Sequence, residues 1–155
     1  MDYSRQELVL GKNELNKKKA AIIGLGAIGS NSANMLARAG LNLVLIDNDN
    51  VEASNINSQS IYCSKDINKP KAVALAMRLR EINNKIEYFN ERITKKNIGI
   101  IKADLVLDCT DNMKTRFLLN DYCKKHGMPL IHSAAIKMIG TVFIVHADAC
   151  LRCIY

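Results

Sequence analysis

The stretch that most constrains the fold is residues 20–29, AAIIGLGAIG. Its first residues are small or β-branched, as in a short buried strand, and Gly24, Gly26 and Gly29 follow in G-x-G-x-x-G spacing. In such a loop the glycines allow a tight turn, close approach of the backbone to a phosphate, and close packing of the next helix on the strand. The first N–H groups of that helix attract an anion. The stretch therefore predicts a nucleotide phosphate site, without saying which nucleotide.

Beyond this stretch, strand-like segments alternate with helix-like ones. Short apolar runs that end near polar residues predict further strands at 41–47, 85–90, 104–109, 130–135 and 140–146. Apolar residues at helical spacing predict helices at 28–39, from Pro70 through the stripe Leu75, Leu79 and Ile82, and at 113–125. The alternation predicts an α/β, Rossmann-like fold with a mainly parallel sheet and helices on both faces. Since only a short turn joins the last two strands, we expect them to be antiparallel. We interpret residues 1–155 as a single domain with its ligand at the C-terminal strand ends.

Two segments have a weaker pattern. Residues 2–19 are polar and helical in pattern, with Leu8, Leu15 and Val9 as the expected contacts. Residues 51–64 have no clean period, and their density of Asn and Ser predicts an ordered loop or a short helical turn.

The chain is basic, with a formal net charge of +7 at pH 7. The positive residues are spread out apart from the run Lys17–Lys19, and the aromatic platforms of single-strand binders are absent, so we do not expect a nucleic-acid partner. The same surface would attract ATP or an acidic protein. The N-terminus lacks the apolar core of a signal peptide, and no apolar run approaches the roughly 20 residues of a membrane span. We therefore expect a cytoplasmic protein.

Five cysteines, an odd number, argue against a disulfide scaffold. Cys63, Cys109 and Cys123 lie among apolar neighbours and are expected in the core. Cys150 and Cys153 form a C-x-x-C pair, which alone is weak evidence for zinc because a structural zinc ion takes four ligands. A thioredoxin-like redox role is disfavoured, because the pair follows the last strand rather than opening a helix.

Asp47 ends the second predicted strand, 23 residues after Gly24. Dinucleotide-binding folds place an acid at about this distance, where its carboxylate accepts hydrogen bonds from a ribose. On this ground alone an NAD-dependent oxidoreductase stays open, as does an acid that merely ends a strand.

The segments that follow Asp47 differ from those of a dehydrogenase. They are SNINSQ (54–59), NKPK (68–71), DCTDN (108–112) and SAAIKMIG (133–140). With Arg5-Gln6 and the Cys150 pair, they resemble the ThiF/MoeB/HesA family, relatives of ubiquitin-activating enzymes, over nearly the whole chain. The resemblance implies that the chain binds ATP and Mg²⁺ and adenylates the C-terminal glycine of a ubiquitin-like sulfur-carrier protein. In that reaction the carrier carboxylate attacks the α-phosphorus and pyrophosphate leaves, so no protein nucleophile is needed.

The resemblance also implies roles for single residues. Lys71 would neutralise charge on the triphosphate, Asp111 would hold Mg²⁺, and Arg5 would reach into the ATP site of a partner subunit. Without the resemblance, Lys71 is a helix lysine in solvent, Asp111 a helix N-cap and Arg5 a free surface arginine. The nucleotide would contact Gly24, Gly26, Ala27, Gly29, Asp47, Asp49, Asn55, Gln59 and Lys71.

One departure from the family pattern is Ser58. The family's S-N-x-N-R-Q motif has an arginine here, whose planar charged fork binds phosphate better than one hydroxyl does. Losing one such contact costs about 100-fold or more in rate. Three outcomes stay open: a slow enzyme, a substitute cation such as Lys65 or Lys69, or a non-catalytic subunit that binds ATP or the carrier.

The other departure is at the C-terminal end. In the family, the counterparts of Cys150 and Cys153 form half of a Cys₄ zinc site, and the other half and further strands lie downstream of the position of Tyr155. We therefore expect an uncovered sheet edge or apolar face, and a homodimer or another subunit that covers it. The C-x-x-C pair argues against the family branch that dehydrates a modified tRNA adenosine, and the basic charge argues for it.

Overall fold

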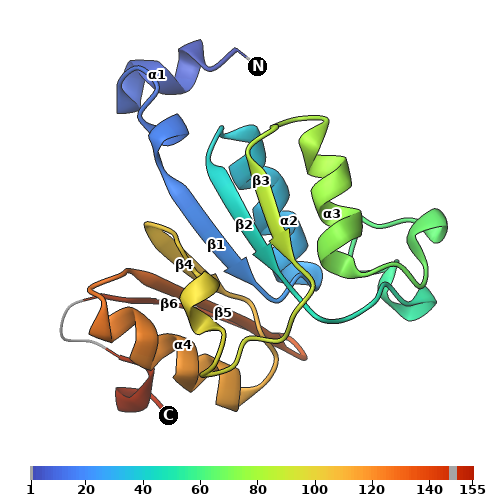
Figure 1. Ribbon diagram of the computed structural model, residues 1–155, viewed down its shortest axis with the longest axis vertical. Helices are drawn as coiled ribbons and strands as arrows, with labels where there is room; N and C mark the ends of the chain where they lie inside the picture. The colour runs from blue at the N-terminus through green and yellow to red at the C-terminus, as the bar shows by residue number, and fades with distance from the viewer. Residues whose placement is uncertain (1, 147–149) are drawn as a thin grey trace.

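The computed structural model describes residues 2–146 and 150–155, which form a six-stranded sheet with helices around it (Figure 1). The strands lie in the order β3-β2-β1-β4-β5-β6. β1 to β5 are parallel and β6 runs antiparallel to β5, so the expected α/β fold is confirmed. The strands are β1 (Lys19–Ile23), β2 (Asn42–Ile46), β3 (Ile86–Phe89), β4 (Leu105–Asp108), β5 (Leu130–Ile136) and β6 (Ile139–Val145).

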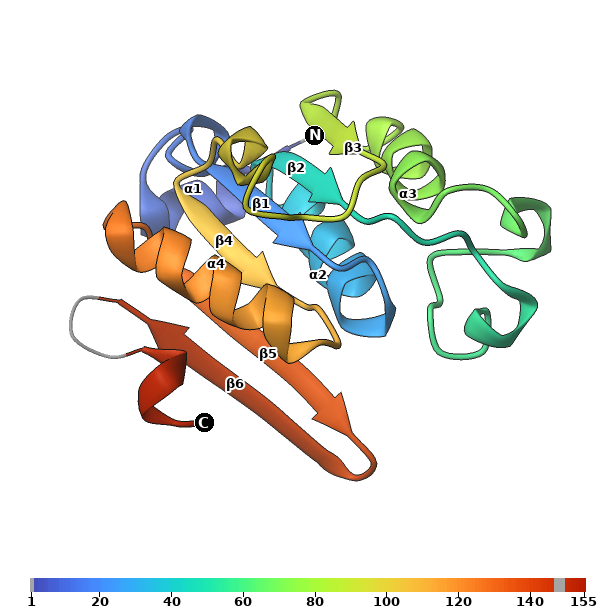
Figure 2. The ribbon, with the colours of Figure 1, turned by 60° about the horizontal axis from the view of Figure 1, so that its bottom comes forward.

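Helices cover both faces of this sheet (Figure 2). α2 (Ala27–Arg38) and α3 (Lys71–Arg80) pack on one face and share a core cluster with β1 and β2. α4 (Met113–Lys125) packs on the other face, in a second cluster. The short helix α1 (Ser4–Leu10) lies beyond the N-terminal end of β1 (Figure 1).

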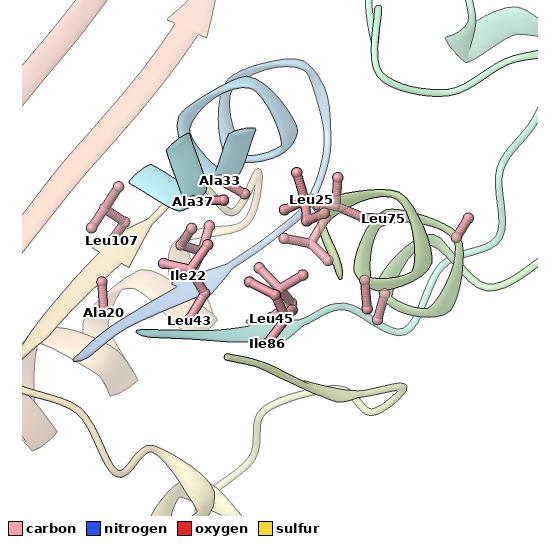
Figure 3. Close-up of a cluster of buried hydrophobic side chains, with 14 of the residues drawn as sticks. Ala20, Ile22, Leu25, Ala33, Ala37, Leu43, Leu45, Leu75, Ile86 and Leu107 are labelled. Carbon is pink, nitrogen blue, oxygen red and sulfur yellow. The ribbon is translucent and has the colours of Figure 1, made fainter. Parts of the chain in front are cut away.

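The centre of the sheet is buried on both faces because its strands are almost continuous apolar runs, as is typical of parallel sheets. Ile22, Leu43 and Leu45 lie under α2 and α3 (Figure 3). α2 presents the small side chains of Ala33 and Ala37 to them, so the helix lies close to the strands. This packing fixes the position of the loop between β1 and α2.

Most elements have the predicted bounds to within two residues, and α4 has them at both ends. The N-terminal segment is the exception, since it is helical only in α1 and in the 3₁₀ turn Leu15–Lys17. The contacts predicted for Leu8 and Val9 are wrong: these side chains are 87% and 83% exposed. They are exposed because α1 lies outside the layers that cover the sheet.

The β5–β6 hairpin leaves an apolar surface uncovered, as expected. Ile139, Val142 and Ile144 of β6 are 70%, 68% and 70% exposed. Within the described residues β6 is also an edge strand. Among those residues, no helix has the length and apolar character needed to cross a membrane.

Candidate functional site

A cavity of about 520 Å³ opens at the C-terminal ends of the central strands. The β1–α2 loop, the segment after β2, the start of α3, the segment after β3 and the β4–α4 loop all contribute to its wall. Segments far apart in the sequence meet here because the carboxyl ends of parallel strands lie at one edge of a sheet. The cavity brings together the predicted site residues Gly24, Gly26, Asp47, Asp49, Asn55, Gln59, Lys71 and Asp111.

The three glycines of the loop have different tasks. Gly24 has a φ of +87°, and a Cβ there would lie 2.7 Å from the Cys109 carbonyl oxygen. A Cβ on Gly29 would lie 1.9 Å from the carbonyl oxygen of Gly24, so α2 packs directly on the loop. At Gly26, where α2 begins, a Cβ would meet nothing within 4 Å. Gly26 therefore keeps open space in the cavity, whereas Gly24 and Gly29 shape the loop; Ala27 and Gly29 are not in the cavity wall.

Asp47 is held at the floor of the cavity by the backbone. Its Oδ2 accepts a hydrogen bond from the Leu25 N–H at 2.6 Å and its Oδ1 one from the Asp49 N–H at 2.7 Å. Burial raises the pKa of Asp47, while these two hydrogen bonds and the charge of Lys71 oppose that rise. Each carboxylate oxygen keeps a further lone pair, so Asp47 can accept a hydrogen bond from a ligand hydroxyl.

Lys71 is the first residue of α3 and is buried, at 7% exposure, rather than in solvent. Its Nζ lies 3.5 Å from Oδ2 of Asp49, and its backbone N–H donates to the Asp49 carbonyl at 2.9 Å. Asp49 therefore contacts Lys71 at both its backbone N–H and its side-chain ammonium group, and holds this cation in the cavity wall. A fixed cation of this kind can neutralise an anionic ligand without reorganisation.

Asp111 lies in the β4–α4 loop and faces the cavity. The N-cap of α4 is Asn112, whose Oδ1 accepts from the Thr115 N–H at 2.9 Å, so the N-cap alternative for Asp111 is wrong. Asp111 is exposed and makes no hydrogen bond or ion pair within residues 2–146 and 150–155. Its carboxylate is available to a cation, and hard cations such as Mg²⁺ prefer oxygen ligands.

The charges around the cavity are mostly negative. Among the described residues in its wall, the carboxylates are Asp47, Asp49, Glu52, Glu91 and Asp111, and the permanent cations are Lys71 and Arg92. A polyphosphate would meet repulsion here unless a divalent cation came with it. The donor set therefore fits a nucleotide bound together with a metal ion.

Sequence reasoning missed Arg92. Its Nε lies 3.4 Å from Oδ1 of Asn48, and its side chain is part of the cavity wall. The signal was its position three residues after β3, because the C-terminal end of a parallel strand lies at this edge of the sheet. Ser58 is exposed and outside the wall, as are the predicted substitutes Lys65 and Lys69. The Nζ of Lys69 lies 3.6 Å from Asp66, and neither lysine side chain is part of the cavity wall in this structure.

Two sets of predicted residues lie away from the cavity. Arg5 is exposed on α1, at the opposite end of β1. Cys150 is the N-cap of the 3₁₀ turn Leu151–Cys153 and Cys153 is its last residue, and their sulfur atoms lie 3.3 Å apart. The hydrogen bond with Cys153 lowers the pKa of Cys150. Among the described residues no third His, Cys, Asp or Glu joins them, so the pair offers two of the four ligands of a zinc site.

The other three cysteines are structural. Cys123 is fully buried, and Cys63 and Cys109 are half-buried. Cys109 lines the cavity, but burial raises the pKa of its thiol to about 11. A thiol protonated at neutral pH is a poor nucleophile, so the cavity has no activated cysteine among its described residues.

Comparison with known proteins identifies the family. A family profile described as the ThiF family matches residues 3–155. The chain belongs to the ThiF family. It is 39% identical to the sulfur carrier protein ThiS adenylyltransferase of Bacillus subtilis, over 98% of this chain and 49% of that protein. It is 35% identical to the SAMP-activating enzyme E1 of Haloferax volcanii, over 94% of this chain and 56% of that protein. This ThiF-family chain thus spans about half the length of the curated relatives that it matches.

Solved structures confirm the fold of this ThiF-family chain. A crystal structure of Escherichia coli MccB with MccA-N7isoASN superposes with a TM-score of 0.88, at 24% identity. The superposition covers 97% of this chain and 50% of the MccB chain. A structure of the same protein with ATP has a TM-score of 0.84, at 25% identity. The arrangement of sheet and helices is therefore that of MccB.

Proposed function

We propose that this chain adenylates the C-terminal glycine of a ubiquitin-like sulfur-carrier protein, using ATP and Mg²⁺ in a single Rossmann-like domain. The observation that carries the proposal is the cavity in which Lys71, Asp47 and Asp111 face one glycine loop. The relatives named as ThiS adenylyltransferase and SAMP-activating enzyme support this class of substrate. The cavity is also wide enough for a nucleotide, since small-molecule sites are typically about 300–1,000 Å³.

Features of the cavity fit ATP. The open space beside Gly26 allows a phosphate to approach the backbone. Gln59 lines the cavity, and its Nε2 makes no hydrogen bond among the described residues, so its N–H groups are available to a ligand. Asp47 accepts from the ribose, and Asp111 offers its carboxylate to Mg²⁺. When bound, Mg²⁺ supplies charge neutralisation on the phosphates.

The proposed reaction is a direct displacement. A carboxylate oxygen of the carrier forms a bond to the α-phosphorus as the bond to the bridging oxygen breaks, giving an acyl-adenylate and pyrophosphate. Charge develops on the leaving pyrophosphate, and Lys71 stabilises it from a fixed position. The other residues align the reactants, and an aligned pair reacts far faster than a free one.

Carrier-dependent ATP–pyrophosphate exchange tests this function. We expect exchange with Mg²⁺ when one of the ubiquitin-like carriers of the source organism is added, and none without a carrier. Failure of every carrier, while calorimetry still detects ATP binding, would contradict the enzymatic proposal. It would favour the alternative of a non-catalytic subunit, which the absence of a cation at Ser58 supports.

Ser58→Arg distinguishes a weakened enzyme from a binding subunit. Ser58 lies in the segment between Asn55 and Gln59, which both line the cavity, so we expect the long side chain of an arginine at this position to extend toward the phosphates. For an enzyme we expect exchange to rise by at least about tenfold, since one charge-assisted contact is restored. Ser60→Arg, which adds the same charge at an exposed position outside the cavity wall, is the control and should change little. No gain from Ser58→Arg would count against a missing arginine as the limiting defect.

We also propose a homodimer, in which Arg5 of one subunit serves the cavity of the other. Within one chain Arg5 lies at the wrong end of β1, and exposed Leu8 and Val9 beside it would be covered by a partner. We expect Arg5→Ala and Asp111→Ala each to abolish exchange. After dissociation and reassociation of an equimolar mixture, about one quarter of wild-type activity should return, because half of the dimers regain one intact site. Lack of recovery in dimers shown to be mixed would exclude a shared site.

The C-x-x-C pair supplies half of a zinc site in this proposal. Two thiols from Cys150 and Cys153 and two further thiols from another segment or subunit would complete the tetrahedral set. In that case Cys150→Ser should lower the zinc content measured by mass spectrometry and leave ATP binding unchanged, since the pair lies away from the cavity.

A further inference from the structure

The carboxylate of Asp108, the last residue of β4, is fully buried and shapes the β4–α4 loop, residues 109–112. Its Oδ1 accepts hydrogen bonds from the backbone N–H of Thr110 at 3.0 Å and from the Thr110 hydroxyl at 2.7 Å. Its Oδ2 lies 2.7 Å from Nδ1 of His132. These donors replace water around the buried carboxylate. Oδ1 has two of them, but His132 is the one partner of Oδ2 among the described residues, so loss of His132 leaves that oxygen without a partner.

His132 is held in place on the neighbouring strand. It faces Asp108 in the register of β4 and β5 and is 0% exposed. The ring of Phe143 on β6 stacks on it, with centroids 6.2 Å apart, and Tyr155 meets it edge-on at 6.1 Å. Its Nε2 has no hydrogen-bond partner among the described residues. Among the described residues, the Asp108 carboxylate is therefore the one hydrogen-bond partner of this imidazole.

α4 fixes the same loop from the other side. Arg116, buried in the first turns of α4, donates from Nε and Nη2 to the Thr110 carbonyl at 3.1 and 2.7 Å. The N–H, hydroxyl and carbonyl of Thr110 are thus all bound. The next residue, Asp111, has no such bond in the described residues and faces the cavity. Hydrogen bonds therefore hold the residue that directly precedes Asp111.

We propose that His132 is a positioning residue for Asp111. Through the Asp108 carboxylate it fixes the backbone at Thr110, and so the direction in which Asp111 presents its oxygens to a divalent cation. This inference rests on the proposed role of Asp111 in binding Mg²⁺. Groups that orient metal ligands without touching the metal typically change metal affinity by about 10- to 100-fold when they are removed.

Amide hydrogen exchange tests the positioning without any ligand. In His132→Leu, which cannot donate to Asp108, the Thr110 amide should exchange at least about tenfold faster, because its acceptor is no longer fixed. His132→Asn places an amide N–H near the position of Nδ1 and should restore most of the protection. Leu130→Ala, two residues earlier on the same strand and in the α4-side core, is the control for general destabilisation.

Mn²⁺ binding gives the second readout. Electron paramagnetic resonance measures free Mn²⁺ in the presence of α,β-methylene ATP, which the protein cannot cleave to an adenylate. We expect the dissociation constant for Mn²⁺ to rise about 10- to 100-fold in His132→Leu, and to stay within about threefold of wild type in His132→Asn. Each variant is measured at a temperature equally far below its own midpoint of thermal unfolding. Under this condition Leu130→Ala should have the same dissociation constant for Mn²⁺ as wild type.

The outcomes separate this inference from the proposed function. Faster Thr110 exchange and weaker Mn²⁺ binding in His132→Leu, both restored by asparagine, support it. Equal effects in His132→Leu and Leu130→Ala, or unchanged values in His132→Leu, overturn it. If the wild-type chain binds no Mn²⁺ with the nucleotide, the proposed metal role of Asp111 fails, and positioning of Asp111 for a cation fails with it, whatever Thr110 exchange shows.

Discussion

The Asp111→Asn variant is expected to lose carrier-dependent ATP–pyrophosphate exchange by at least about 100-fold. An asparagine keeps the shape of the side chain but removes the negative charge that a hard cation needs. Asp111 makes no hydrogen bond or ion pair in the part of the chain that the structure describes, so the folded state loses nothing. The free energy of unfolding in urea should stay within about 0.5 kcal/mol of wild type.

The control for this variant is Asp121→Asn. Asp121 lies on α4 and forms an exposed ion pair with Arg152, with a shortest distance of 2.7 Å. The change in chemistry is the same, but the site is outside the cavity wall, so exchange should be unaffected and stability should fall by less than about 1 kcal/mol. Exchange that survives in Asp111→Asn would mean that a different group holds the cation, and the assignment of Asp111 would be wrong.

The sequence predicts the sheet well because its strands are short apolar runs that are bounded by glycines or polar residues. The run 20–23 and the glycines after it leave little choice of structure, and α4 has the bounds that its apolar spacing predicts. The sequence fails at α1, where apolar Leu8 and Val9 suggest contacts that a single chain does not make. Apolar character predicts burial only when the fold supplies a surface to pack against.

The site was predicted only in part because the sequence does not give side-chain directions. The position of Lys71 in the cavity follows from its place at the start of α3, and that of Asp111 from the loop after β4. Arg92 has no motif, and its position needed the order of the strands. The same holds for His132 and Asp108, which are 24 residues apart and meet because β4 and β5 are neighbours in register.

The largest effect on folding is expected for Gly29→Ala. An added Cβ would lie 1.9 Å from the carbonyl oxygen of Gly24 and 3.2 Å from Cβ of Cys109, and the first of these is backbone that cannot rotate away. α2 would have to move off the β1–α2 loop, which breaks the packing of Ala33 and Ala37 on the sheet. We expect a loss of about 3 kcal/mol or more, measured by urea denaturation.

Gly26→Ala is the matched variant, because it adds the same methyl group to the same loop. Gly26 has a φ of −72°, which any L-residue adopts, and nothing lies within 4 Å of the added Cβ. The free energy of unfolding should therefore change by less than about 1 kcal/mol. The methyl group occupies the space through which a phosphate approaches the backbone, so the affinity for ATP by calorimetry should fall by at least about tenfold. Unchanged affinity for ATP in Gly26→Ala would place the phosphates elsewhere in the cavity. A Gly29→Ala variant as stable as wild type would show that α2 can shift on its loop without loss of the fold.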